Sequence, residues 1–300
     1  MESLKTILYF SLFRYPLMLD EICNFSVSKN KDKVATELDE LIAKKIICKI
    51  DEFYLSDYDL DSIEKRKSGN KIAVEALKKA KEKAQFIAKF PFVEAVGVSG
   101  SLSKGYYDKD SDIDFFVITS VNKVWLCRSF LMLYKKLFLF NSRKYFCVNY
   151  FVSAGNLEIE EKNRFTATEI KTLIPFTGRT AFVEFYKQNN WIVDIFGQFT
   201  PKLESVKNVK KPIPTKLSEQ IFQTVFGNAI DNVLKRVTVY FWKIKFRQMS
   251  REEFKIALKS TTNISKHHPQ NFQKQVLTSL NQKYDEIKRK HNIELPKEYV

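Results

Sequence analysis

The chain has 300 residues, of which 44% are apolar and 14% aromatic, a composition that excludes an intrinsically disordered protein. This length is enough for two or three domains with a substantial hydrophobic core. A formal net charge of +15 favours a polyanionic partner such as a nucleoside triphosphate, a nucleic acid or an anionic membrane surface, although a lysine-rich solvated surface gives the same balance.

The charge is unevenly distributed along the chain. Residues 1–60 hold 8 Lys and Arg against 11 Asp and Glu, whereas residues 201–300 hold 20 against 9. The positive field therefore comes from the middle and the C-terminal part of the chain.

No targeting or membrane-spanning segment is predicted. The apolar stretch 4–19 contains Arg14, and the run 130–140 contains Lys135 and Lys136 and is too short to cross a bilayer. The four cysteines lack C-x-x-C spacing and are typical of buried hydrophobic residues in a reducing compartment. We therefore expect a cytoplasmic protein without a membrane partner, a disulfide framework or a zinc site.

Residues 1–60 predict a small helical module that ends in a β-hairpin. Apolar periodicity predicts helices over 4–13, 19–25 and 32–44, and two β-rich segments around a polar turn at 51–52 predict the hairpin. Three helices followed by a hairpin resemble a winged helix, a fold widely used to bind DNA. Because this module is acidic and duplex binding requires neutralised phosphates, we expect it to contact protein and not DNA.

A long charged helix is predicted over 61–89, before Pro91. Apolar residues at helical spacing predict one buried stripe on it, formed by Ile72, Val74, Leu77, Ala80, Ala84 and Ile87. This stripe is expected to pack onto the sheet that follows.

A strand–turn–strand segment carries the strongest functional signal. Residues 93–98 predict a buried strand, and the pair Gly100-Ser101 breaks it before a short helix over 101–107. A second apolar strand is predicted over 112–119. Backbone N–H groups at the start of the short helix form a natural cradle for phosphate.

Asp112 and Asp114 lie two residues apart on the second strand, so both carboxylates are expected on one face. Two neighbouring carboxylates repel each other unless a cation lies between them. Oxygen ligands on one face suit Mg²⁺ or Mn²⁺, with substrate phosphates completing the coordination shell. The alternative is an ordinary strand–turn–strand with a polar hairpin, but unpaired carboxylates inside an apolar strand are costly. Phosphates and paired carboxylates together predict metal-assisted nucleotidyl transfer.

The order Gly100-Ser101, short helix, Asp112-x-Asp114 resembles the signature of the polymerase-β-like nucleotidyltransferase superfamily in its minimal bacterial and archaeal form. The resemblance implies an α/β (α+β) fold with a nucleotidyltransferase-type mixed sheet and helices. It also implies that Ser101 and the Gly100 turn contact the triphosphate and that both aspartates bind the metal. In similar sequences a basic residue at the position of Lys104 faces the triphosphate, and a solvent-exposed lysine is the alternative.

Superfamily members carry a third carboxylate, which the resemblance places on a strand predicted over 144–152. Alternation predicts that Asn149 and Phe151 share a face, and Asn149 is the best positional match for the third acid. An asparagine offers a neutral oxygen but cannot accept a proton at neutral pH. Glu158 and Glu160, just beyond this strand, are the alternative candidates.

The proline-flanked basic stretch 201–214 is the one linker-like segment, and it divides a nucleotidyltransferase domain over 61–200 from a C-terminal helical domain over 201–300. Amphipathic patterns predict helices over 217–246 and 270–290, among others. The basic face of this region suits a polyanionic acceptor or a solvated helix bundle equally well.

Asn189, Asn190 and Trp191 are polar and aromatic groups that either build an acceptor pocket or fix a turn against the core.

The sequence thus predicts an enzyme that transfers a nucleoside monophosphate from an NTP to an acceptor hydroxyl and releases pyrophosphate. The acceptor is left open between a small molecule, a protein side chain and an RNA end. Since the third acid is missing, a non-catalytic nucleotide-binding regulator that signals through the N-terminal module is the alternative. A DNA-binding regulator with a relic transferase domain is a third hypothesis, which the acidic N-terminal module disfavours.

Overall fold

A five-stranded mixed sheet lies at the centre of the computed structural model, which describes residues 1–140, 144, 146–208 and 211–299. Its strand order is β6-β3-β4-β5-β7, with β3 (Val93–Ser99), β4 (Asp114–Thr119), β5 (Cys147–Ser153), β6 (Ile174–Thr177) and β7 (Ile264–Lys266). β4 and β5 are parallel, whereas the other neighbours pair antiparallel. The predicted mixed sheet with helices is therefore confirmed.

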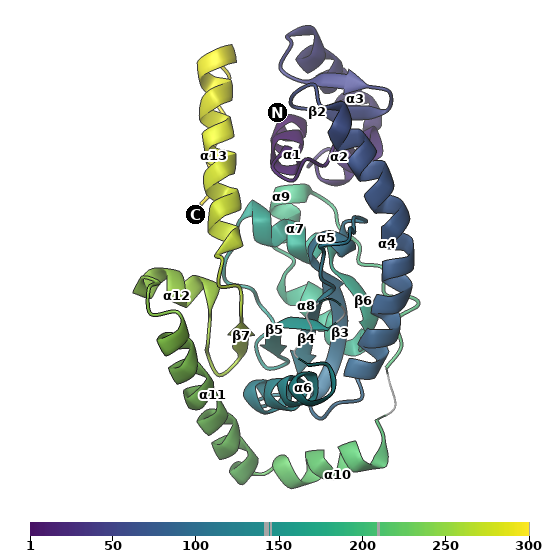
Figure 1. Ribbon diagram of the computed structural model, residues 1–300. Coiled ribbons are helices and arrows are strands. Elements are labelled where there is room, and N and C mark those ends of the chain that lie inside the picture. The colour runs from purple at the N-terminus through teal and green to yellow at the C-terminus, as the bar shows by residue number, and fades with distance from the viewer. Residues whose placement is uncertain (141–143, 145, 209–210, 300) are drawn as a thin grey trace.

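Two layers of buried side chains lie on the two faces of this sheet. On one face, α4 (Leu60–Ile87) and α6 (Val124–Phe138) pack against the strands. On the other face lie α7 (Arg164–Thr172), α8 (Arg179–Gln188) and α9 (Ile192–Phe196) (Figure 1). The long helix α4 runs along the sheet at the edge of the molecule opposite to the C-terminal helices (Figure 1).

The buried stripe of α4 differs from the predicted one. Ile72 and Val74 are 46% and 57% exposed, whereas the small residues Gly69, Ala73 and Ala76 are buried. The expectation was wrong at these positions because it followed the large apolar residues. A stripe of small residues lets the helix approach its neighbours closely, and the ring of Tyr106 lies directly against Gly69.

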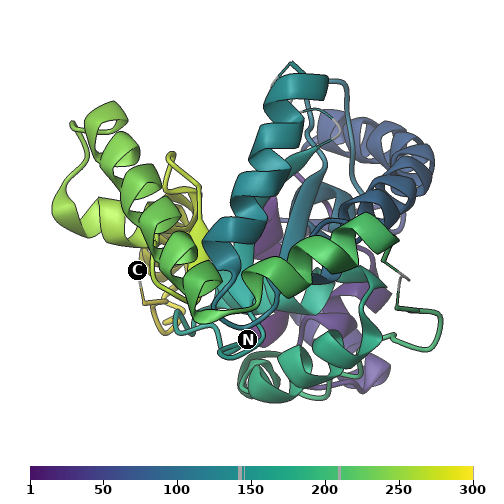
Figure 2. The ribbon, with the colours of Figure 1, turned by 90° about the horizontal axis from the view of Figure 1, so that it is seen from below.

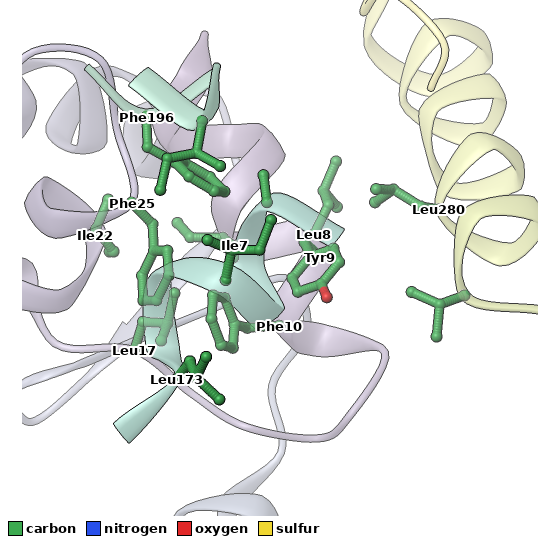
Figure 3. Packing of buried hydrophobic residues seen from close by; sticks show 14 of the residues in the cluster. Ile7, Leu8, Tyr9, Phe10, Leu17, Ile22, Phe25, Leu173, Phe196 and Leu280 are labelled. Atoms are coloured by element: carbon green, nitrogen blue, oxygen red, sulfur yellow. The ribbon is translucent and has the colours of Figure 1, made fainter. Parts of the chain in front are cut away.

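The N-terminal segment has the predicted order of three helices and a hairpin. Its elements are α1 (Glu2–Ser11), α2 (Leu19–Asn24), α3 (Lys31–Ala43), β1 (Cys48–Ile50) and β2 (Phe53–Leu55). The buried apolar residues of its helices belong to the same cluster as those of α7, α8 and α9, whereas Phe53 and Leu55 of the hairpin pack with Ile63 of α4. Figure 3 shows side chains of α1 between Phe196 of α9 and Leu280 of the last helix. Its winged-helix character stays a prediction.

The sequence predicts a purely helical C-terminal part, but the structure contains a strand there as well. This part consists of α10 (Ile213–Phe222), α11 (Val225–Lys245), α12 (Arg251–Ala257), strand β7 and α13 (Phe272–His291). β7 pairs with β5 and so extends the central sheet. The helix predicted over 217–246 is divided into α10 and α11, with a tight turn between them. This turn requires glycine at position 227, because a side chain there would collide with the carbonyl of Phe222.

Three remaining expectations concern membranes, cysteines and the linker. Within the described ranges, each helix is either too short or too polar to serve as a membrane-spanning segment. The four cysteines are free thiols. Residues 209–210 of the predicted linker and Tyr145 of the predicted strand 144–152 lie outside the described residues.

The start of α6 is capped from α11, far along the chain. The backbone N–H groups of Trp125 and Leu126 donate hydrogen bonds of 2.9 and 2.7 Å to Oδ1 of Asp231. The side chain of Asp231 is 2% exposed, and its burial raises the pKa of this carboxyl to about 6. Figure 2 shows α10 and α11 beside α6, the helix that this contact holds in place.

Replacing this cap should destabilise the fold. We expect Asp231→Ala to lower the free energy of unfolding by about 2 kcal/mol, because two buried N–H groups lose their acceptor. Urea unfolding measures the change, with Asn232→Ala at the exposed neighbouring position as the matched control. Equal stability of the two variants would show that the contact contributes nothing.

Candidate active site

The turn after β3 brings Gly100 against Asp114. Helix α5 (Gly100–Ser103) begins here, and Gly100 has a φ of +71°, in the left-handed region. A Cβ atom on this residue would lie 2.7 Å from Oδ2 of Asp114. Glycine is therefore needed twice, for the backbone conformation and for the close approach of the carboxylate. The start of α5 and the second aspartate of the motif are therefore in close contact.

The two aspartates do not occupy equivalent positions. β4 begins at Asp114, so Asp112 precedes the strand and is not part of it, contrary to the prediction of a strand over 112–119. Asp114 lines a cavity of about 450 Å³, and Asp112 lies outside that lining. The two carboxylates are nevertheless close enough for the charge of Asp112 to raise the pKa of Asp114.

The carboxyl of Asp114 is strongly perturbed. Its burial is the main cause that raises its pKa to about 6, and a hydrogen bond with the Cys147 thiol opposes the increase. The neighbouring carboxylates of Asp112 and Glu169 raise the pKa further, whereas the Lys104 ammonium lowers it. A partly buried acid that faces two other acids is an arrangement whose repulsion a bound cation would relieve.

Glu169 of α7 is a site residue that the sequence analysis did not identify. Its Oε1 accepts a 2.7 Å hydrogen bond from Nζ of Lys104, and its Oε2 accepts a 3.3 Å bond from the backbone N–H of Gly100. Nζ of Lys104 also donates to the carbonyl of Gly100, at 3.0 Å. This carboxylate thus contacts two of the groups that were predicted to hold phosphate. The available signal in the sequence is that Glu169 is the only acid of α7.

Asn149 lies beside Asp114, as its position on β5 predicted. The pairing of β4 with β5 shifts by one residue here, so Asn149 forms a β-bulge. For this reason the predicted alternation was wrong: Asn149 lines the cavity, whereas Phe151 packs in the layer that contains α6. Nδ2 of Asn149 donates to Sγ of Cys147 at 2.9 Å and lies 3.5 Å from Oδ1 of Asp114. Asn149 therefore presents its amide nitrogen to the aspartate.

The two alternative candidates for the third acid are outside the site. Glu158 and Glu160 are exposed and form ion pairs with Lys162 and Lys259, at 2.7 Å in both cases. Neither side chain lines the cavity, although their neighbour Glu161 does. Glu169, and neither of these two residues, is the acid that acts on Asp114 together with Asp112.

The cavity extends from the start of α5 across β5 to β7. Gly100, Ser101 and Lys104 line it at the end near β3. Aromatic side chains from both ends of the chain, from the sheet and from α7 and α8 form much of its wall: Phe10, Phe13, Tyr15, Phe116, Tyr150, Phe165, Phe185 and Phe272. Five of the six predicted catalytic and nucleotide-binding residues thus meet at one cavity, and Asp112 lies just outside it.

The predicted pocket at residues 189–191 is a turn. Asn189 is fully buried, and its side chain holds the backbone of Leu157 and Ile159 through hydrogen bonds of 2.8 and 2.9 Å. Of the two interpretations given for this segment, the structural one is correct.

The donor set fits a metal that arrives with a substrate. Among the described residues, no group of three or more His, Cys, Asp or Glu side chains is placed to hold a metal ion. Mg²⁺ is commonly bound by one or two carboxylates together with substrate phosphates. Asp112 and the partly buried Asp114 supply such a pair, next to the turn expected to hold phosphate.

Comparison with protein families identifies a domain around this site. Residues 77–175 match a family model described as a nucleotidyltransferase domain. The matched range contains the Gly100 turn, both aspartates, Asn149 and Glu169. The comparisons with curated proteins and with solved structures found no match for the chain.

The perturbed carboxyl predicts a pH-dependent effect of Asp114→Asn. The folded pKa of about 6 lies above the ordinary value of 3.8, so this group loses stabilising free energy as the pH rises through that window. We expect Asp114→Asn to increase the free energy of unfolding by about 2 kcal/mol at pH 8 and to give no increase at pH 4.

Urea unfolding at the two pH values, with a chelator present, measures this difference. Asp110→Asn, at an exposed position of the same loop, is the control. A gain that is the same at both pH values would show that charge repulsion is not its cause.

Proposed function

Since residues 77–175 form a nucleotidyltransferase domain of the polymerase-β-like superfamily, we propose that this enzyme transfers a nucleoside monophosphate from an NTP to an acceptor hydroxyl with the help of Mg²⁺ or Mn²⁺. The contact between the Gly100 turn and the carboxylate of Asp114 is the observation that supports this most. It brings the turn that we propose for phosphate and an acid of raised pKa to one end of one cavity.

The chain's own residues have distinct roles in this proposal. The backbone N–H of Gly100 and the hydroxyl of Ser101 bind the triphosphate, and the ammonium of Lys104 offsets its charge. Asp112 and Asp114 hold the divalent metal, which supplies electrostatic stabilisation of the reacting phosphate. Asn149 supports the site by fixing the carboxylate of Asp114 and the thiol of Cys147.

The transfer is an in-line displacement at the α-phosphorus. The acceptor oxygen forms a bond to this phosphorus, and the bond from the phosphorus to the oxygen that bridges to the β-phosphate breaks. Pyrophosphate leaves with the electron pair of that bond, and the hydroxyl proton is released to water. Positioning by the cavity and charge stabilisation supply most of the rate.

Loss of either aspartate should abolish transfer. Purified protein is incubated with each α-labelled NTP, Mg²⁺ and a cell lysate, and the label on new products is measured. We expect label with the unchanged protein and with Asp110→Asn, and a decrease of at least about a hundredfold with Asp112→Asn or Asp114→Asn.

Equal label with Asp114→Asn and the unchanged protein would contradict the proposal. Magnesium-dependent NTP binding in a thermal-shift assay, without any transfer, would instead support the nucleotide-binding regulator.

The carboxylate of Glu169 competes with the triphosphate in this proposal. It holds the N–H of Gly100 and the ammonium of Lys104, the same groups that bind phosphate. We expect Glu169→Gln to tighten NTP binding by about tenfold, because a negative charge next to the triphosphate is removed.

Calorimetric titration with each NTP and Mg²⁺ measures the affinity. Glu184→Gln, at a half-exposed position on α8, should leave it unchanged. Weaker binding by Glu169→Gln would show that this residue helps to hold the nucleotide.

A further inference from the structure

The strand order divides the site into a β3 side, which carries the Gly100 turn, and a β5–β7 side. The Gly100 turn follows β3, Asp114 begins β4, and β5 and β7 lie beyond it in the sheet. In phosphoryl transfer the attacking and leaving oxygens are roughly in line on opposite sides of the phosphorus. With pyrophosphate held on the β3 side, the acceptor hydroxyl must approach from the side of β5 and β7.

On that side the cavity forms a chamber that is lined by aromatic rings from distant parts of the chain. Phe13, in the turn after α1, lies around it together with Phe165 of α7, Phe272 of α13 and Tyr150 of β5. The Phe13 and Phe165 rings lie 6.0 and 6.2 Å from the Phe272 ring. The whole cavity, including the end proposed for the triphosphate, has a volume of about 450 Å³, which is typical of a site for small molecules.

The charges on the β5–β7 side of the lining do not suit a polyanion, although the whole chain is basic. Among the described lining residues of this side, the charged groups are Glu161 and Lys266, of opposite sign, whereas Lys104, Asp114 and Glu169 lie at the end proposed for the triphosphate. His268 adds no charge at neutral pH, because burial lowers its pKa to about 4. An RNA end requires an excess of positive charge. This chamber therefore favours an uncharged occupant.

Asn271 supplies a second, independent indication of a ligand. Its side chain is 9% exposed and lines the cavity, and within the described part of the chain neither its Nδ2 nor its Oδ1 has a hydrogen-bond partner. A buried amide left unpaired costs about 1–3 kcal/mol. The residue also has a φ of +46° at the start of α13. A ligand group that both donates and accepts hydrogen bonds would satisfy it.

We propose that the chamber on the β5–β7 side is the acceptor site and that the acceptor is a small, uncharged ring compound with a hydroxyl and an amide-like group that pairs with Asn271. This inference rests on the proposed function, because it assigns the second substrate of the same reaction. The acceptor hydroxyl becomes the phosphodiester oxygen, and pyrophosphate leaves towards the β3 side.

A defined probe and one substitution test this assignment. The probe is 4-hydroxyacetanilide, which carries a ring, a hydroxyl and an amide, titrated into the protein in the presence of Mg²⁺ and a non-hydrolysable NTP. Asn271→Gly removes the amide and suits the positive φ. We expect the unchanged protein to bind the probe and Asn271→Gly to bind it about tenfold more weakly.

The stability of the variant separates a ligand-binding role from a structural one. Removing an unpaired buried amide should leave the melting temperature unchanged or raise it. Asn232→Ala, at an exposed position on α11, should alter neither the affinity nor the melting temperature. A lower melting temperature with unchanged probe affinity would assign Asn271 a structural role and overturn the inference.

The remaining outcomes distinguish the two levels of the proposal. NTP binding without probe binding, or label transferred from NTP to RNA or protein in a fractionated lysate, would overturn the acceptor assignment and leave the transferase intact. Absence of NTP binding would overturn the proposed function and this inference with it. Label on a compound in the low-molecular-mass filtrate supports both.

Discussion

The carboxylate of Asp114, which packs against the Gly100 turn, is the constraint around which the site is arranged. Burial and two neighbouring acids make its charge unfavourable, so the site carries a local free-energy cost. The rest of the fold offsets this cost through the two apolar layers of the sheet. The charge that the proposed reaction needs at this residue therefore lowers the stability of the fold, as is common at functional sites.

The enclosure of the cavity depends on segments that lie far apart in the sequence. The first helix, α7 and the start of α13 all contribute rings to its wall, and their apolar residues share one buried cluster. The division at residues 60 and 200 remains a prediction about the order of the chain. The core that closes the site nevertheless reaches from α1 to α13, so the N-terminal module is part of the site's framework.

Local spacing explains what the sequence could predict. The glycine turn, the aspartates and most helices follow from residue patterns within a few positions, and the structure reproduces them with small changes in their bounds. Glu169 and Asn271 could not be found in this way, because only the tertiary fold brings them to the cavity. The bulge at Asn149 was also not predicted, because the alternation of side chains along a strand assumes regular pairing. β7 is three residues long and carries too little pattern to be recognised.

Because Gly100 and Asp114 are in contact, the residue that one position tolerates depends on the residue at the other. A side chain at Gly100 would collide with the carboxylate in its present position, so a substitution there requires the aspartate to move. A copy that has lost the acid is free of this steric restriction. The glycine is then favoured only by its left-handed backbone conformation.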